Sequence, residues 1–290
     1  MRTLPLLLAA AFGATAASAQ QPQPQPRLIF ADEFDGQALD RSKWNVIGPD
    51  FWVNNEQQAY VDSDKTIHID QGVDGASGGV LTLQPQWQPG YATPSGRKAD
   101  FISGRIDTRG KFDFAYGRAE ARIRMTDHVG VWPAWWMLGN GKWPDTGEID
   151  IMEYVGARDW TGVAVHGPGY SGDRGPVNRY YFRKGEPDVT GWHVYAVDWT
   201  PDQLTFLVDG NVAFTVPRAT IEHDNKWVFD DKTHLILNFA VGGVYPEKVN
   251  NIRKPYAGVP QATVDAIKRG EPRMHVDWVR VWQGADARPN

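Results

Sequence analysis

The chain contains no cysteine among its 290 residues. Disulfide bonds, thiol catalysis and cysteine-ligated zinc are therefore excluded. Apolar runs long enough to span a bilayer are also absent, so no membrane span is expected. There is no long basic patch and the net charge is -5, which argues against a nucleic-acid partner. Aromatic residues are plentiful instead, with 13 Trp and 10 Tyr, and flat apolar rings suit the faces of sugars.

The N-terminal segment predicts export. Residues 1–19 are typical of a secretory signal peptide, because Arg2 precedes an apolar run over residues 4–12 and small residues end the segment. Residues 20–26 are only Gln and Pro, which indicates a short extended linker. The mature protein is therefore expected to be secreted, either to the periplasm or outside the cell.

Residues 27–290 predict one domain of the all-β class. Short apolar runs are separated by Gly, Pro, Asn and Asp, as in a β-sandwich, and Asp209-Gly210-Asn211 predicts a tight hairpin. Short helices are expected only at residues 217–222 and 261–269. The clearest strand-length runs are residues 79–83, 116–125, 204–208 and 234–241.

Residues 274–282 alternate between two sets of side chains and predict a closing strand. Strict alternation places one set on each face of the sheet. One face would carry Met274, Val276, Trp278, Arg280 and Trp282, and the other His275, Asp277, Val279 and Val281.

Three carboxylates, Glu148, Asp150 and Glu153, lie close together in a segment of strand-forming residues. Glu148 and Asp150 have the same parity and share a face, but Glu153 has the opposite parity. In a regular strand Glu153 would point into the core, where an unpaired carboxylate is costly. One inserted residue, a β-bulge near Met152, would return Glu153 to the face of the other two acids.

With this bulge, Glu148 and Glu153 are effectively four strand positions apart, about 13 Å between Cα atoms. On a concave sheet the two side chains can lean together to about 5–6 Å, which matches retaining glycosidases and lies below the roughly 6.5–9.5 Å of inverting ones. The alternatives are a surface strand with solvated acids and a site for a hard cation.

Eight sequence blocks resemble glycoside hydrolase family 16 and occur in that family's order. The blocks are residues 32–36, 54–57, 103–106, 116–122, 132–138, 147–153, 166–172 and 235–243. The nearest subgroup in this resemblance is the bacterial laminarinases, which are endo-β-1,3-glucanases. The resemblance implies a concanavalin-like β-jelly-roll, in which two antiparallel sheets stack and the concave one forms a cleft for a glucan chain.

The resemblance also implies a retaining double displacement, with residues 27–290 as the catalytic domain. Glu148 matches the family's nucleophile, Glu153 its acid/base, and Asp150 the residue that hydrogen-bonds the nucleophile. Three carboxylates on one face cannot all ionise easily, so at least one pKa must rise. No cofactor is expected for catalysis, the expected partner is a β-1,3-glucan, and the protein is expected to be a monomer.

Several alternatives share parts of this pattern. The inserted Met152 distinguishes the chain from mixed-linkage β-1,3-1,4-glucanases, whose acids strictly alternate. Agarases, carrageenases and some transglycosylases share the bulge, and the blocks at residues 54–56 and 166–172 favour a laminarinase. A transglycosylase, a hydrolase of another β-linked polysaccharide and a noncatalytic carbohydrate-binding sandwich remain open.

Further residues are candidates for substrate binding. Trp136 and Trp143 are predicted sugar platforms, and Trp132 is either a platform or part of the core. Tyr245 stands where the family often carries Trp, and it can still stack on a sugar. The polar candidates offer donors and acceptors suited to hydroxyl groups. They are Asn54, Asn55, Glu56, Arg105, His166 and Asn238.

Members of the fold often hold a structural calcium ion on the convex side. By position, the carbonyl oxygens of Glu33 and Gly79 and the group at Asp277 would be its ligands. The sequence has no dedicated calcium-binding loop, so this expectation depends on the resemblance alone.

Overall fold

The computed structural model describes residues 26–284. The predicted signal peptide, residues 1–19, and all but the last residue of the predicted linker, 20–26, lie outside the described residues. Within the described part, no helix is long and apolar enough to cross a membrane.

One large sheet has eight strands, all paired antiparallel. Its strands are β1 (Arg27–Asp32), β4 (Ile67–Asp70), β5 (Val80–Leu83), β9 (Gly117–Met125), β14 (His193–Trp199), β15 (Gln203–Val208), β16 (Asn211–Pro217) and β18 (Met274–Gln283). Their order is β16-β15-β14-β9-β18-β5-β4, and β1 pairs with β18. The four strongest sequence-predicted strands are confirmed, three of them in this sheet.

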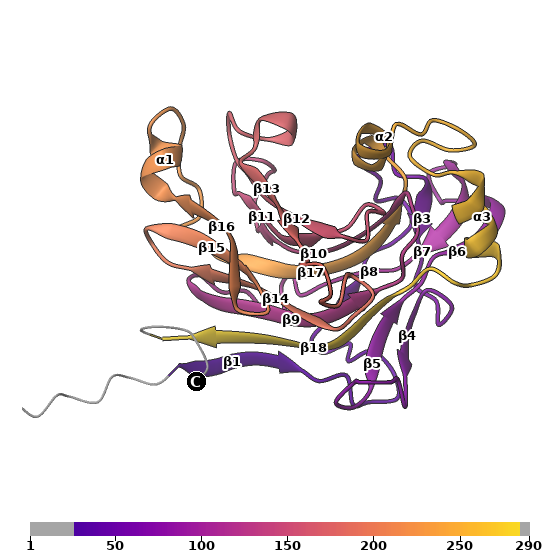
Figure 1. Ribbon diagram of the computed structural model, residues 1–290, viewed down its shortest axis with the longest axis horizontal. Coiled ribbons are helices and arrows are strands. Elements are labelled where there is room, and N and C mark those ends of the chain that lie inside the picture. Colours follow the sequence, from indigo (N-terminus) through magenta and orange to yellow (C-terminus); the bar gives the residue numbers. More distant parts are fainter. Residues whose placement is uncertain (1–25, 285–290) are drawn as a thin grey trace, which may run out of the picture.

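The second large sheet has seven antiparallel strands. They are β2 (Asn45–Val46), β8 (Arg105–Asp107), β10 (Val131–Gly139), β11 (Glu148–Glu153), β12 (Trp160–His166), β13 (Val177–Tyr181) and β17 (Thr233–Val241). Their order is β13-β12-β11-β10-β17-β8-β2, so β11 lies between β10 and β12. Figure 1 shows this sheet stacked on the eight-stranded one, both curved in the same direction. The predicted jelly-roll of two antiparallel sheets is confirmed.

A third, small sheet was not predicted. It contains β3 (Gln58–Tyr60), β7 (Lys98–Ser103) and β6 (Gln86–Ala92), and β3 pairs with β7 in parallel. The helices are short: α1 (Arg218–Glu222), α2 (Val244–Asn250), α3 (Gln261–Lys268) and the 3₁₀ turn η1 (Gly172–Arg174). The sequence predicted α1 and α3, and it missed α2.

Local chemistry explains the main turn that the sequence predicted. β15 and β16 form a hairpin in which Val208 pairs with Asn211. Asp209 and Gly210 make the two-residue turn with φ of 51° and 77°. Positive φ at both positions defines the turn that matches the twist of a two-stranded ribbon.

The hydrophobic core lies between the two large sheets. Inward-facing residues such as Trp135 of β10 and Ile149 of β11 meet residues such as Ala121 and Ile123 of β9 in one continuous cluster. Because each strand gives alternate residues to this core, its other residues are left for the outer faces. On the seven-stranded sheet, that outer face is the concave one in Figure 1.

The strict alternation predicted for residues 274–282 is wrong. The register of β18 against β9 shifts between Val276 and Trp278, so Asp277 is an inserted residue. Before the bulge the even-numbered residues of β18 face the core, and after it the odd-numbered residues do. The core residues of β18 are Met274, Val276, Val279 and Val281. Trp278 and Trp282, predicted to share a face with Val276, are therefore not members of the core cluster.

Candidate active site

The predicted bulge in β11 is present. The register against β10 shifts between Asp150 and Met152, and against β12 between Asp150 and Glu153. Ile151 and Met152 therefore share one strand position, and both are buried in the core. Glu153 returns to the face of Glu148 and Asp150, because the two consecutive apolar side chains both point inward.

The register on β10 gives the spacing of the two glutamates. Glu148 lies opposite Leu138 and Glu153 lies opposite Ala134, four residues apart on an unbroken strand. On β12, Glu153 lies opposite Gly162. Both cross-strand neighbours of Glu153 are therefore small.

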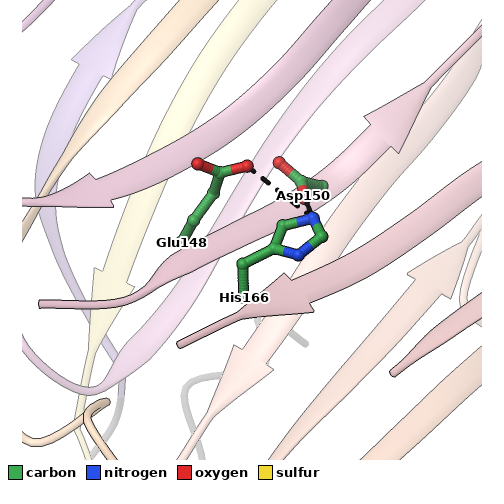
Figure 2. Close-up of side chains that lie close together, drawn as sticks. All are labelled: Glu148, Asp150 and His166. Atoms are coloured by element: carbon green, nitrogen blue, oxygen red, sulfur yellow. Dashed lines mark ion pairs between the residues drawn. The ribbon is translucent and has the colours of Figure 1, made fainter. Parts of the chain in front are cut away.

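His166 lies directly beside the acids because β12 places it opposite Glu148. Its Nε2 atom is 3.3 Å from Oδ2 of Asp150 and 3.8 Å from Oε1 of Glu148. Figure 2 shows the imidazole ring pointing toward both carboxylates, with the acids on one strand and His166 on the next. His166 was predicted as a binding residue, and the structure brings it to the carboxylates themselves.

Two tryptophans each donate a hydrogen bond to one glutamate. The indole N–H of Trp132 donates to Oε1 of Glu153 at 2.9 Å. The side chain of Trp143 hydrogen-bonds Glu148, although Trp143 is 47% exposed. Both residues were predicted from their flat rings, but their N–H groups, which are their only polar side-chain atoms, also bind the acids.

Burial raises the pKa of all three carboxyl groups, each to about 8. The mutual proximity of the acids raises the pKa of Glu148 and Glu153 further, since two negative charges at close range repel. His166 and the bond from Trp143 oppose the rise for Glu148, and Trp132 opposes it for Glu153. The cluster therefore holds protons at neutral pH, and each glutamate has a donor that favours its ionised form.

Tyr245 borders the Glu153 end of the site. It lies in α2, and its ring meets that of Trp132 edge-on at 5.5 Å between centroids. A Cβ atom on Gly162 would lie 3.4 Å from the Tyr245 hydroxyl, so this tyrosine reaches over the glycine beside Glu153. The predicted stacking residue is thus close to the carboxylates.

A second group of predicted residues forms a buried hydrogen-bond network. The indole N–H of Trp136 donates to Oδ1 of Asn238 at 2.7 Å, and Nδ2 of Asn238 donates to the Tyr60 hydroxyl at 3.1 Å. Oε2 of Glu56 accepts hydrogen bonds from Gln58 and Tyr60. Glu56 is buried and burial raises its pKa, so its carboxylate supports this network rather than facing solvent.

Arg105 joins the same network through its guanidinium group. The group lies 4.1 Å from the ring centre of Phe51 and 4.9 Å from that of Trp136. This places a cation between two aromatic faces, an arrangement that orders both rings. Arg105 is buried, and its Nε atom has no hydrogen-bond partner among the described residues.

Sequence reasoning missed several members of this network. Gln58 and Tyr60 are two and four residues after Glu56, so strand periodicity alone could have placed all three on one face. Phe51 and Trp52 gave no such signal. They lie in an exposed loop, and the Trp52 side chain donates to the backbone oxygen of Glu56.

Asn54 and Asn55 are exposed and have left-handed backbone conformations, with φ of 53° and 54°. The carbonyl oxygen of Asn54 accepts the N–H of Val244 at the start of α2. Asn tolerates this conformation better than most residues, which gives the pair a turn-forming role. Their side chains stay predicted substrate contacts.

The residues expected to hold calcium lie between β1, β5 and β18, away from the carboxylates. The Asp277 carboxylate is fully buried and accepts hydrogen bonds from Ser77, and from Arg122 at 2.5 Å. The Glu33 carboxylate pairs with Arg280. Because the charge of Asp277 is already balanced by a guanidinium, its side chain does not fit a calcium ligand in this arrangement. Calcium binding stays a prediction for the backbone oxygens of Glu33 and Gly79.

Comparison with known proteins agrees with this site. The family model described as Glycosyl hydrolases family 16 matches residues 50–279. A beta-glucanase from Rhodothermus marinus is 36% identical over 260 residues, covering 84% of this chain and 86% of the relative. The laminarinase catalytic domain from Thermotoga maritima MSB8 superposes with a TM-score of 0.77 at 30% identity, covering 90% of this chain and all of that domain.

A third relative has a different named activity. A beta-1,3-glucan-binding protein from Penaeus monodon is 31% identical over 354 residues, covering 94% of this chain and 95% of the relative. The fold and the carboxylate strand define a glycoside hydrolase. The chain belongs to glycosyl hydrolase family 16, as its sequence blocks predicted.

Proposed function

We propose that the protein is a retaining endo-β-1,3-glucanase that hydrolyses laminarin-like glucan by double displacement. The observation that carries the proposal is the bulge in β11, which brings Glu148 and Glu153 to one face with a separate indole donor for each. The named activities of the Rhodothermus and Thermotoga relatives support the substrate class.

In the first step, Glu148 attacks the anomeric carbon while Glu153 protonates the departing glycosidic oxygen. The raised pKa of Glu153, about 8, keeps that acid protonated at neutral pH. The pKa of Glu148 is raised to the same value, so the reactive form is the one in which Glu148 has released its proton while Glu153 keeps its own. Trp143 and His166 both favour the ionised form of Glu148. Asp150 lies on the same face of β11 and, when it carries a proton, can donate a hydrogen bond that orients the ionised Glu148.

In the second step, water attacks the glycosyl ester at Glu148. Glu153, now ionised, accepts the proton of that water, and the sugar leaves with its original β configuration. The N–H of Trp132 stabilises Glu153 in this ionised state. One residue thus acts as acid and then as base, with its hydrogen-bond donor in place for the second role.

Product stereochemistry tests this mechanism. Laminarin hydrolysis followed by proton NMR should show the β-anomer first, with the α-anomer arising only by mutarotation. The predicted carboxylate separation of about 5–6 Å requires this result, whereas an α-anomer as first product would indicate inversion and overturn the mechanism.

A panel of laminarin, lichenan, agarose and carrageenan tests the substrate. We expect the fastest release of reducing ends from laminarin, with medium-sized oligosaccharides appearing early because cleavage is internal. Faster hydrolysis of another polysaccharide would reassign the substrate while keeping the chemistry. Products longer than the starting oligosaccharide would instead identify a transglycosylase.

A noncatalytic glucan-binding protein is the second candidate, favoured by the Penaeus relative. The three acids on one face, with donors to both glutamates, argue for catalysis, because binding alone needs no such set. Glucan binding without any product release would support the binding protein.

Export and a monomeric state complete the proposal. The composition of residues 1–19 supports a cleaved signal peptide. Mass spectrometry of the protein secreted by a Gram-negative host should give a new N-terminus near residue 20. Size-exclusion chromatography with light scattering should give the mass of one chain.

A further inference from the structure

Three side chains at the carboxylate strand form a group with metal-binding chemistry. One nitrogen of His166 and one oxygen each of Glu148 and Asp150 all lie within 4.8 Å of one another. Figure 2 shows the three groups converging from two neighbouring strands. One imidazole and two carboxylates suit zinc and related transition metals better than calcium or magnesium, which prefer oxygen ligands alone.

A second observation points to a ligand at this place. Asp150 is only 4% exposed, and its Oδ2 atom has no hydrogen-bond partner among the described residues. That oxygen faces Nε2 of His166 at 3.3 Å. A buried carboxylate oxygen that accepts no hydrogen bond is costly, and a cation between it and the imidazole would remove that cost.

We infer that Glu148, Asp150 and His166 bind one Zn²⁺ ion, which inhibits the enzyme by occupying the nucleophile. Ligand atoms around tetrahedral zinc are about 3.4 Å apart when each bond is about 2.1 Å. The distances of 3.3 and 3.8 Å from His166 Nε2 to the two acids are close to this value. Small side-chain rotations complete the site, and the fourth position stays open for water.

The site suits a reversible inhibitor rather than a resident ion. A zinc-bound histidine normally donates its other N–H to a partner that fixes the ring. The Nδ1 atom of His166 is buried without such a partner among the described residues, and the backbone at Gly175 packs against this ring edge. Loss of that partner typically lowers metal affinity 10- to 100-fold, so the ion should exchange readily.

The inhibition rests on the proposed function, because it requires Glu148 to be the nucleophile. The binding does not, so it is measured separately. Isothermal titration of ZnCl₂ into the metal-free full chain should show a site that His166→Ala weakens at least 10-fold. Asp150→Asn serves as a second variant and should also weaken that site, with circular dichroism confirming that each variant is folded.

The chain offers a matched control at its surface. His223 lies 2.9 Å from Asp224, and both side chains are largely exposed. His223→Ala should leave the zinc affinity of the proposed site unchanged. Equal zinc binding by wild type, His166→Ala and Asp150→Asn would overturn the site.

Kinetics give the other half of the test. With laminarin as substrate, ZnCl₂ should raise KM and leave kcat unchanged, whereas MgCl₂ and CaCl₂ at the same concentration should have no effect. Zinc bound at His166 with no change in KM would overturn the inhibition. A protein that hydrolyses no glucan even without zinc would refute the proposed function, and the calorimetry would still decide whether the metal site exists.

Discussion

β11 and β18 both lose their alternation at a β-bulge, one in each large sheet. In β11 the two bulged residues, Ile151 and Met152, are apolar and buried, and the bulge returns Glu153 to the outer face. In β18 the inserted residue is Asp277, which is itself buried, and the bulge exchanges the strand's core-facing set. The first bulge returns a carboxyl group to the outer face, and the second keeps apolar side chains in the core.

The difference explains why only one bulge could be predicted. A regular β11 would bury an unpaired Glu153, so the sequence contains a visible conflict. In β18 each parity mixes apolar with polar residues, Arg280 in one set and His275 and Asp277 in the other, so the sequence does not reveal where the alternation breaks. The buried carboxylate of Asp277 is tolerated because Ser77 and Arg122 bind it, and these partners are 200 and 155 residues away in the chain.

Replacing Glu148, the proposed nucleophile, should separate activity from stability at β11. Glu148→Gln should lower kcat on laminarin by about four orders of magnitude or more, since the covalent route is lost. It should not lower the free energy of unfolding at pH 7, because the variant removes a buried acid whose pKa is raised. Reducing-sugar assays and urea unfolding measure the two quantities. Near-wild-type activity would refute the assigned role of β11.

The opposite result is expected at β18. Asp277→Ala should lower the free energy of unfolding by about 2–4 kcal/mol, because it leaves Arg122 without its buried partner. Activity per folded molecule should stay the same, since β18 lies in the other sheet. Urea unfolding and kcat at 25 °C test both statements.

Asp224→Ala is the matched control for this prediction. Asp224 pairs with His223 at 2.9 Å but is 78% exposed, so its removal should change stability by less than about 0.5 kcal/mol. An equal effect of the two substitutions would show that the Asp277 bulge has no special structural role.

Prediction from sequence succeeded where the signal was local. The carboxylate strand, the Asp209-Gly210 hairpin and helix α3 all depend on neighbouring residues. Contacts between distant segments were not predictable in this way. Asn238 and Tyr60 are 178 residues apart, and their hydrogen bond gives Asn238 a structural partner that its sequence neighbourhood does not reveal.

The tryptophans show the same limit. Aromatic character predicted that Trp132, Trp136 and Trp143 belong near the site, and all three donate hydrogen bonds there. The acceptor of each N–H depends on sheet register, which the sequence defines only through the β11 bulge. The third sheet was missed for a similar reason, because β3 pairs in parallel with β7 about forty residues later.

Glu153→Gln should reveal how much stability the protein loses by burying the ionisable carboxyl group of Glu153. Burial raises the pKa of Glu153 from 4.5 to about 8, so the folded protein retains a proton that the unfolded chain releases. The contribution of Glu153 to wild-type stability therefore falls as the pH rises from about 4.5 to 8. The variant cannot ionise, so its advantage should be near zero at pH 4.5 and reach about 1–3 kcal/mol at pH 8. Urea unfolding at pH 4.5, 6 and 8 measures this, and a pH-independent difference would contradict it.

The smallest effect is expected from the hydrogen bond that Trp132 donates to Glu153. Trp132→Phe keeps an aromatic ring beside Tyr245 but removes the N–H that favours the ionised carboxylate. The pKa of Glu153 should rise further, moving the alkaline limb of kcat/KM upward by about half to one pH unit. The value of kcat should fall about 10-fold, because the ionised base of the second step loses its donor.

Trp136→Phe separates this role from the general loss of an indole beside the carboxylate strand. Its N–H binds Asn238 rather than a carboxylate, so the alkaline limb should stay in place even if KM rises. An equal shift in both variants would mean that ring size, and not the hydrogen bond to Glu153, sets the position of the alkaline limb of kcat/KM. A shift in Trp132→Phe alone would show that the β11 bulge does more than return Glu153 to the outer face, because it also brings the acid within reach of the donor on β10.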